Sequence, residues 1–113
     1  MNTLLVLTNL PDQESAEHLA RQLIEARVAA CVNILAPCRS IYRWQGEVGS
    51  ATEVPLLIKT SAARYEALQA AIRAGHPYEL PEIVALPIER GLPDYLAWVA
   101  AETSAESDPG SAA

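Results

Sequence analysis

Residues 76–83, which read His-Pro-Tyr-Glu-Leu-Pro-Glu-Ile, carry the side chains in this chain that are best suited to chemistry. Pro77 and Pro81 fix φ and remove two backbone donors, so we expect a stiff, extended connection. The stretch holds one of only two histidines, a tyrosine and two glutamates. A rigid loop that sets an imidazole beside carboxylates can bind a cation or a polar ligand. The same composition also fits a connection that only guides the chain into its last strand.

The candidate metal ligands are His76, Glu79 and Glu82, because one imidazole and two carboxylates suit a borderline divalent ion. The prolines exclude a helix, so the three-residue spacing does not place these side chains on one face. A metal site would therefore depend on loop geometry or on a neighbouring subunit. The alternative is a His76 that is hydrogen-bonded so as to close the loop.

Lys59 is the only lysine and lies on an expected central strand, where Val54, Leu56 and Ile58 share one face. Strand alternation places Lys59 on the opposite face. Its ammonium would there form a structural ion pair, for example with Glu82, or anchor a small anionic ligand in a cleft between subunits.

The elements that must position these residues follow the order strand, helix, strand, strand, helix, strand. The expected bounds are strands at 3–8, 29–35, 48–60 and 83–88, and helices at 13–27, from 60–61 to 75, and at 92–101. This order predicts an α+β, ferredoxin-like fold: an antiparallel sheet with both main helices on one face, the first and third strands central, and an extra C-terminal helix. Gly75 is expected to end the second helix at the C′ position. We expect one domain over residues 1–101, followed by a disordered acidic tail at 102–113.

The second and third strands form a hairpin of about thirty residues, against the usual five or six per strand. The second strand continues in extended form over 38–44, and a turn is expected at 45–47. Tyr42 and Trp44 alternate with Ile41 and Arg43, so both faces of the far end have apolar groups to bury. Large exposed apolar patches are rare on monomers, which favours an oligomer. The alternative is a hairpin that curls over its own sheet.

Composition limits the remaining classes of function. The formal net charge is −6, which argues against nonspecific nucleic-acid binding. The N-terminus has no basic region before its short apolar run, and no stretch reaches membrane-spanning length. Cys31 and Cys38 form no metal-binding pattern and are expected to be reduced thiols. We therefore expect a cytoplasmic protein that binds neither membranes nor nucleic acids.

Five blocks of sequence, taken together and in order, resemble the divalent-cation tolerance protein family, CutA. The blocks are Cys31-Val32-Asn33-Ile34, Ile41-Tyr42-Arg43-Trp44-Gln45-Gly46, Leu57-Ile58-Lys59-Thr60, His76-Pro77-Tyr78-Glu79 and Tyr95-Leu96-Ala97-Trp98. The resemblance covers about Leu4 to Trp98. It implies a ferredoxin-like protomer in a tight homotrimer, held by the long hairpin and the C-terminal segment. It also implies a role in tolerance to copper and other divalent metals, with no settled enzymatic reaction.

The chain departs from the copper-binding pattern of that family at two positions. Some relatives have a cysteine where this chain has Thr8 and a further histidine where it has Gly75, so only His76 carries over. Cu(I) favours sulfur ligands and Cu(II) favours several nitrogens, so these changes remove much of the affinity. Copper is the one cofactor that the resemblance suggests, and weak binding is expected.

The leading hypothesis is thus a non-enzymatic, trimeric protein of divalent-cation tolerance, whose partner is a metal ion or a small anionic ligand. A second hypothesis is a signalling trimer that binds a small molecule in the clefts between subunits. Its candidate cleft residues are Lys59, Tyr78, Tyr42 and Trp44, although packing in an interface also suits the last two. A third hypothesis is an enzyme that uses His76 as an acid–base catalyst, which requires a partner group within hydrogen-bonding reach.

Overall fold

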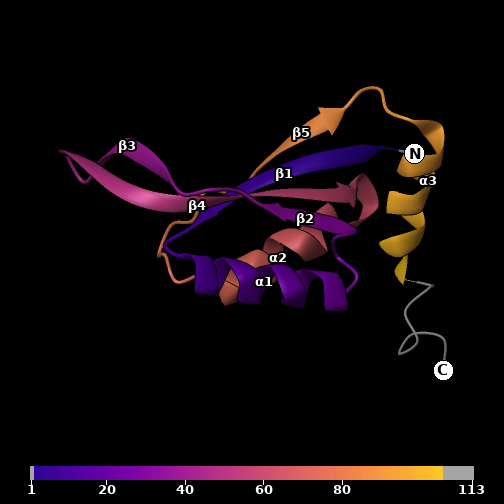
Figure 1. Ribbon diagram of the computed structural model, residues 1–113, viewed down its shortest axis with the longest axis horizontal. Helices are drawn as coiled ribbons and strands as arrows, with labels where there is room; N and C mark the ends of the chain where they lie inside the picture. The colour runs from indigo at the N-terminus through magenta and orange to yellow at the C-terminus, as the bar shows by residue number, and fades with distance from the viewer. Residues whose placement is uncertain (1, 106–113) are drawn as a thin grey trace.

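The computed structural model describes residues 2–105, and Figure 1 shows how its elements are arranged. Within these residues the strands are β1 (Thr3–Leu10), β2 (Cys31–Ile34), β3 (Cys38–Trp44), β4 (Glu47–Ser61) and β5 (Val84–Ile88). The helices are α1 (Gln13–Glu25), α2 (Tyr65–Gly75) and α3 (Pro93–Glu102), and a 3₁₀ turn, η1 (Ala62–Arg64), precedes α2. No helix in this part of the chain is long and apolar enough to span a membrane.

β1 and β4 form the centre of an antiparallel sheet whose strand order is β2-β4-β1-β5. β3 pairs with the N-terminal half of β4, and β2 pairs with its C-terminal half. In the central pair Val6 lies opposite Ile58, and Leu10 lies opposite Val54. The predicted ferredoxin-like, α+β fold is confirmed, with the first and third expected strands at the centre of the sheet.

α1 and α2 lie side by side on one face of the sheet and bury it (Figure 1). α1 begins where the Asp12 carboxylate accepts a hydrogen bond of 2.7 Å from the Ser15 N–H, which satisfies a donor that the first helical turn leaves free. Apolar residues at helical spacing then face the sheet. The core that results is at most 4% exposed and consists of Val6, Leu10, Ala16, Leu19, Leu23, Val28, Ala29, Val54, Leu56, Ile58, Leu68 and Ile72.

Gly75 does not have the C′ role that the sequence predicts. It is the last residue of α2 and its φ is not positive, and His76 follows it directly in an extended conformation. A Cβ on Gly75 would lie 3.0 Å from Cδ1 of Leu19. The absence of a side chain at Gly75 therefore lets α2 approach α1 closely, which is a packing role and not a conformational one.

The packed chain continues past residue 101, where the sequence analysis ended the domain. Thr103 is fully buried, and its hydroxyl donates to the Val99 carbonyl at 2.8 Å and lies 3.0 Å from the Ser61 hydroxyl. The C-terminus of α3 is thereby fixed to the end of β4. Residues 106–113 of the predicted tail lie outside the described residues.

The paired residues Cys38–Trp44 and Glu47–Glu53 form an arm that projects beyond α1 and α2 (Figure 1). Its tip is a two-residue turn in which Gln45 and Gly46 both have positive φ, of 50° and 83°. This is the type I′ geometry that matches the twist of a hairpin. The arm does not curl back over its own sheet, and the molecule is 48 Å long.

The arm begins at an irregularity between β2 and β3. Ile34 pairs with Leu56 and Cys38 with Glu53, so three residues on one strand face two residues, 54 and 55, on the other. The carbonyl of Pro55 accepts a hydrogen bond from the Leu35 N–H at 2.9 Å. Because the nitrogen and the carbonyl of one strand residue point to the same side, the nitrogen of Pro55 also faces the unpaired residues between β2 and β3. A proline without an N–H is tolerated at such a bulge, and bulges increase local twist.

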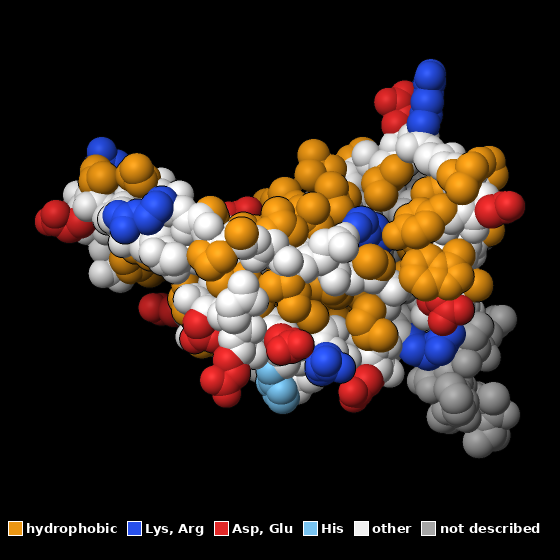
Figure 2. Space-filling view, in the orientation of Figure 1, with side chains coloured by type: hydrophobic (Ala, Val, Ile, Leu, Met, Phe, Trp, Pro, Cys, Tyr) orange, Lys and Arg blue, Asp and Glu red, His pale blue; other side chains and the backbone are white. Residues whose placement is uncertain are grey.

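The face of the sheet that α1 and α2 leave uncovered is the open face. Leu5, Leu7 and Leu57 lie half-buried on it, and Val84 and Leu86 of β5 are 46% and 49% exposed. Figure 2 shows hydrophobic side chains gathered over the middle of the molecule and over α3. Such an extended apolar surface is uncommon on a monomer.

Candidate functional site

Residues 76–83, the His-Pro segment, run from the end of α2 to β5 as an irregular connection that His76 fastens to β1. The Nε2 atom of His76 lies 2.6 Å from the carbonyl oxygen of Asn9, and Nδ1 accepts from the Tyr78 N–H at 3.1 Å. Because Nδ1 of the neutral ring accepts a hydrogen bond, the proton is on Nε2, which donates a hydrogen bond to the Asn9 carbonyl. The imidazole is buried and closes the loop, as one of the two expectations for His76 had it.

His76, Glu79 and Glu82 do not form the metal site that they suggest in the sequence. Both nitrogens of His76 are hydrogen-bonded within the chain, and Glu82 accepts from the Asn9 side-chain amide at 3.2 Å. Within residues 2–105 no group of three or more His, Cys, Asp or Glu side chains is placed to hold a metal ion. The donor set of a single chain therefore does not fit copper, which needs several free nitrogen or sulfur ligands.

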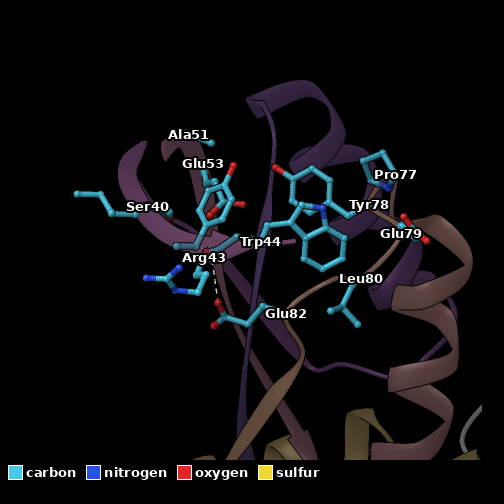
Figure 3. A pocket seen from close by; sticks show the side chains of 13 residues that line it. Ser40, Arg43, Trp44, Ala51, Glu53, Pro77, Tyr78, Glu79, Leu80 and Glu82 are labelled. Carbon is cyan, nitrogen blue, oxygen red and sulfur yellow. Dashed lines mark hydrogen bonds between the residues drawn. The ribbon is translucent and has the colours of Figure 1, made fainter. Parts of the chain in front are cut away.

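A cavity of about 880 Å³ lies between the arm and the His-Pro segment (Figure 3). Tyr42 and Trp44 contribute to it from β3, and Tyr78 contributes from the His-Pro segment. The structure thus brings together three of the four residues predicted to line a ligand cleft. It does so within one chain, although residues 42 and 78 are far apart in the sequence.

Three carboxylates, Glu53, Glu79 and Glu82, also line this cavity. Burial, the negative charge of Glu53 and hydrogen bonding to that carboxylate raise the pKa of Tyr78 from 10.0 to about 12. Tyr78 is therefore a neutral phenol at physiological pH, and its hydroxyl is directed to the Glu53 carboxylate. The cavity combines aromatic surface with negative charge.

Lys59, the fourth predicted cleft residue, is not in the cavity. Its Nζ donates to the side-chain carbonyl of Asn33, on the open face directly opposite Cys31. Within one chain, over the described residues, Lys59 forms no hydrogen bond or ion pair with Glu82 or Tyr78, and its predicted place with them in a cleft between subunits stays a prediction. Strand alternation predicts the face of the sheet on which Lys59 lies. It does not predict that Lys59 lies opposite Cys31, outside the lining of the cavity.

Sequence reasoning missed Asn9 and Glu53. Glu53 pairs with Cys38, so it lies on the same face of the arm as Tyr42 and Trp44. Alternation could have placed it there once the hairpin register was known. Asn9 gave no such signal, because its backbone and side chain hold the His-Pro segment only through tertiary contacts.

The β-α-β-β-α-β order, the antiparallel sheet and the projecting hairpin define an α+β protein of the ferredoxin-like class. The family described as CutA1 divalent ion tolerance protein matches residues 4–102. This chain belongs to that family.

Curated relatives agree with this assignment. The divalent-cation tolerance protein CutA of Thermus thermophilus is 48% identical over 99 residues, which are 88% of this chain and 96% of the relative. Protein CutA of Mus musculus is 42% identical over 102 residues, or 90% of this chain, but the match spans only 58% of the mouse protein. None of these names denotes an enzymatic reaction.

Solved structures show the same fold. CutA from Xylella fastidiosa superimposes with a TM-score of 0.89 at 41% identity and covers 92% of this chain and all of that one. The divalent cation tolerance protein of Thermus thermophilus gives a TM-score of 0.88 at 46% identity and covers 90% of this chain and 99% of that one.

Proposed function

We propose that this divalent-cation tolerance family member acts as a non-enzymatic homotrimer. The observation that carries the proposal is the amount of apolar surface left exposed on the arm and on the open face. On the arm, Ile41 is 77% exposed and Val48 is 66% exposed, and on the open face Leu86 is 49% exposed. Burial of apolar side chains stabilises an interface at about 25 cal/mol per Å², so these surfaces favour association.

Two different surfaces favour a ring over a twofold dimer. An arm that packs on the open face of a neighbour makes a heterologous contact, because the two surfaces involved are not the same. Heterologous contacts close into rings, and three copies form the smallest ring. A twofold dimer buries both surfaces only if each arm reaches the open face of the other chain at the same time, whereas in a ring each arm packs on the next chain alone.

Sedimentation of the full chain tests the proposal. We expect a species of three times the 12.2 kDa chain mass. Leu86→Glu places a charge on the open face and should give smaller species. The control is Ile24→Glu on α1, which charges a residue that is similarly exposed, at 41%, but lies away from the open face, and it should sediment as the wild type does. A wild-type monomer would contradict the proposal.

The engaged imidazole supports a non-enzymatic role. His76 is the residue that an acid–base mechanism would use, and its ring already donates to Asn9 and accepts from Tyr78. A general base needs a free nitrogen directed at the proton that it removes.

A cytoplasmic location is part of the same proposal. Cys31 and Cys38 are free thiols, and Cys38 is exposed. Exposed thiols persist in reducing compartments, whereas oxidising compartments favour disulfides. Fractionation of cells that express the chain should place it with cytoplasmic markers.

A further inference from the structure

We propose that the cavity between the arm and the His-Pro segment binds a small organic cation, namely an ammonium group carried on a compact molecule. The inference concerns a site formed by one chain, so it does not rest on the trimer. It goes beyond metal tolerance, because its ligand is held by aromatic faces and carboxylates and not by metal coordination.

The cavity has the size and construction of a ligand site. Its volume of about 880 Å³ lies within the range of about 300–1,000 Å³ that is usual for small-molecule pockets. One wall is the two-stranded arm, and the other is the proline-stiffened His-Pro segment. His76 holds the second wall against β1 through its bond to Asn9. Both walls are thus positioned before any ligand arrives.

The charge of the cavity selects a cation. Glu53, Glu79 and Glu82 all line it. Arg43 is the only basic residue of its lining, and in Figure 3 its guanidinium points away from the ring of Trp44. Negative charge in a partly enclosed space attracts cations and repels anions. The anionic ligand that the sequence suggested through Lys59 does not suit this cavity.

Besides the carboxylates, the aromatic rings of the cavity favour a bound cation. Figure 3 shows the indole of Trp44 and the phenol of Tyr78, both of which line the cavity, between the arm and the His-Pro segment. A cation over an aromatic face gains about 0.5–2 kcal/mol, and alkylated ammonium ions are typical ligands of such surfaces. The ring of Tyr42 lies over Gly49 on the paired strand, where a Cβ would lie 3.2 Å from the tyrosine ring. The missing side chain leaves room for this ring.

The two faces of the arm carry different side chains. Tyr42 and Trp44 share the face that carries Glu53, whereas Ile41 and Val48 share the other face. The second pair is the more exposed, at 77% and 66%, against 45% and 43% for the two aromatic residues. Val48 lies outside the cavity lining and therefore suits contact with a neighbouring copy, Ile41 borders both surfaces, and the aromatic residues remain available to a ligand.

The test is a titration with choline, followed by two-dimensional NMR of the two tryptophan indole N–H groups. Trp44 lines the cavity and Trp98 lies on α3, so one resonance reports the site and the other is an internal control. Choline should shift the Trp44 resonance in a saturable way and leave that of Trp98 unchanged. The neutral isostere 3,3-dimethylbutan-1-ol and the anion propionate should produce at least tenfold weaker responses.

Two variants and two matched controls locate the cation. Glu53→Gln and Trp44→Leu should each weaken the choline response at least tenfold, the second followed by calorimetry. Glu66→Gln on α2 and Trp98→Leu on α3 make the same changes outside the cavity and should leave the affinity unchanged. Equal binding of choline and its neutral isostere would overturn the proposal, as would no saturable shift or an unaltered affinity in Glu53→Gln.

Discussion

His76 is the residue to which the sequence draws most attention, and in the folded chain it acts as a fastener. Its imidazole bonds the Asn9 carbonyl and the Tyr78 N–H, and the residue is 9% exposed. We expect His76→Ala to lower the free energy of unfolding by about 1–3 kcal/mol, because it leaves buried polar groups without partners. Urea unfolding measures this. His18→Ala on the exposed side of α1 is the control and should change stability by less than about 0.5 kcal/mol. Equal midpoints for the two variants would contradict the fastening role.

Tyr78 provides a pH-dependent readout of the cavity. Its pKa is raised from 10.0 to about 12 by burial and then by the charge of Glu53 and hydrogen bonding to it. The folded state thus holds the phenol proton more tightly than the unfolded state. The stability that this contributes is complete below pH 10 and is lost as the pH rises toward about 12.

Glu53→Gln should move the pKa of Tyr78 back toward its ordinary value, because it removes the negative charge that opposes ionisation. Phenolate absorbance, compared with that of Tyr78→Phe, isolates this tyrosine from the other three in the chain. The matched variant Glu66→Gln should leave the titration as it is. If the Tyr78 titration is identical in Glu53→Gln, then Glu53 does not act on the phenol.

At the scale of elements, local patterns predicted most of the fold because each strand and helix carries its own signal. Alternation placed Val54, Leu56 and Ile58 on one face of β4, and all three are buried. The pattern of a cap followed by helical spacing predicted α1 to within two residues of its end, and Gly46 lies in the predicted turn.

The errors concern features that only contacts between elements decide. The sequence predicts a helix cap at Gly75, but this residue serves the approach of α2 to Leu19, which is distant in sequence. The composition predicts a disordered tail that includes Thr103, yet the Thr103 hydroxyl lies 3.0 Å from that of Ser61, which is 42 positions away in the sequence. Neither contact leaves a periodic pattern in the sequence around it.

The candidate site was predicted in part for the same reason. Tyr42, Trp44 and Tyr78 were selected by residue type and do meet in one cavity. Lys59 was selected in the same way, but it lies at a different place on the sheet and is held by Asn33. Residue type identifies a group that can bind a ligand, whereas register and the path of a loop decide which groups meet.

At the scale of the whole molecule, the arm is the feature on which assembly and the cavity both depend. Replacement of residues 40–51 by Asn-Gly would keep the pair Arg39 and Thr52 and close the shortened hairpin with a favourable turn. The core lies outside the arm, so we expect cooperative unfolding and a helical circular dichroism spectrum. Sedimentation should give species smaller than a trimer, and calorimetry should show no saturable binding of choline.

The variant Val48→Lys separates the two roles of the arm, because Val48 lies on the face opposite Tyr42 and Trp44 and does not line the cavity. A lysine at this exposed position lies directly opposite Arg43, so it gains no matched partner within the arm and should break the contact with a neighbouring chain, since a desolvated charge without a partner is unfavourable in an interface. We expect loss of the trimer together with a choline response at Trp44 like that of the wild type. A trimer that persists would mean that the open face associates without the arm. If the choline response is lost together with the trimer, then the cavity needs a second chain. That result would contradict the assignment of the binding site to a single chain.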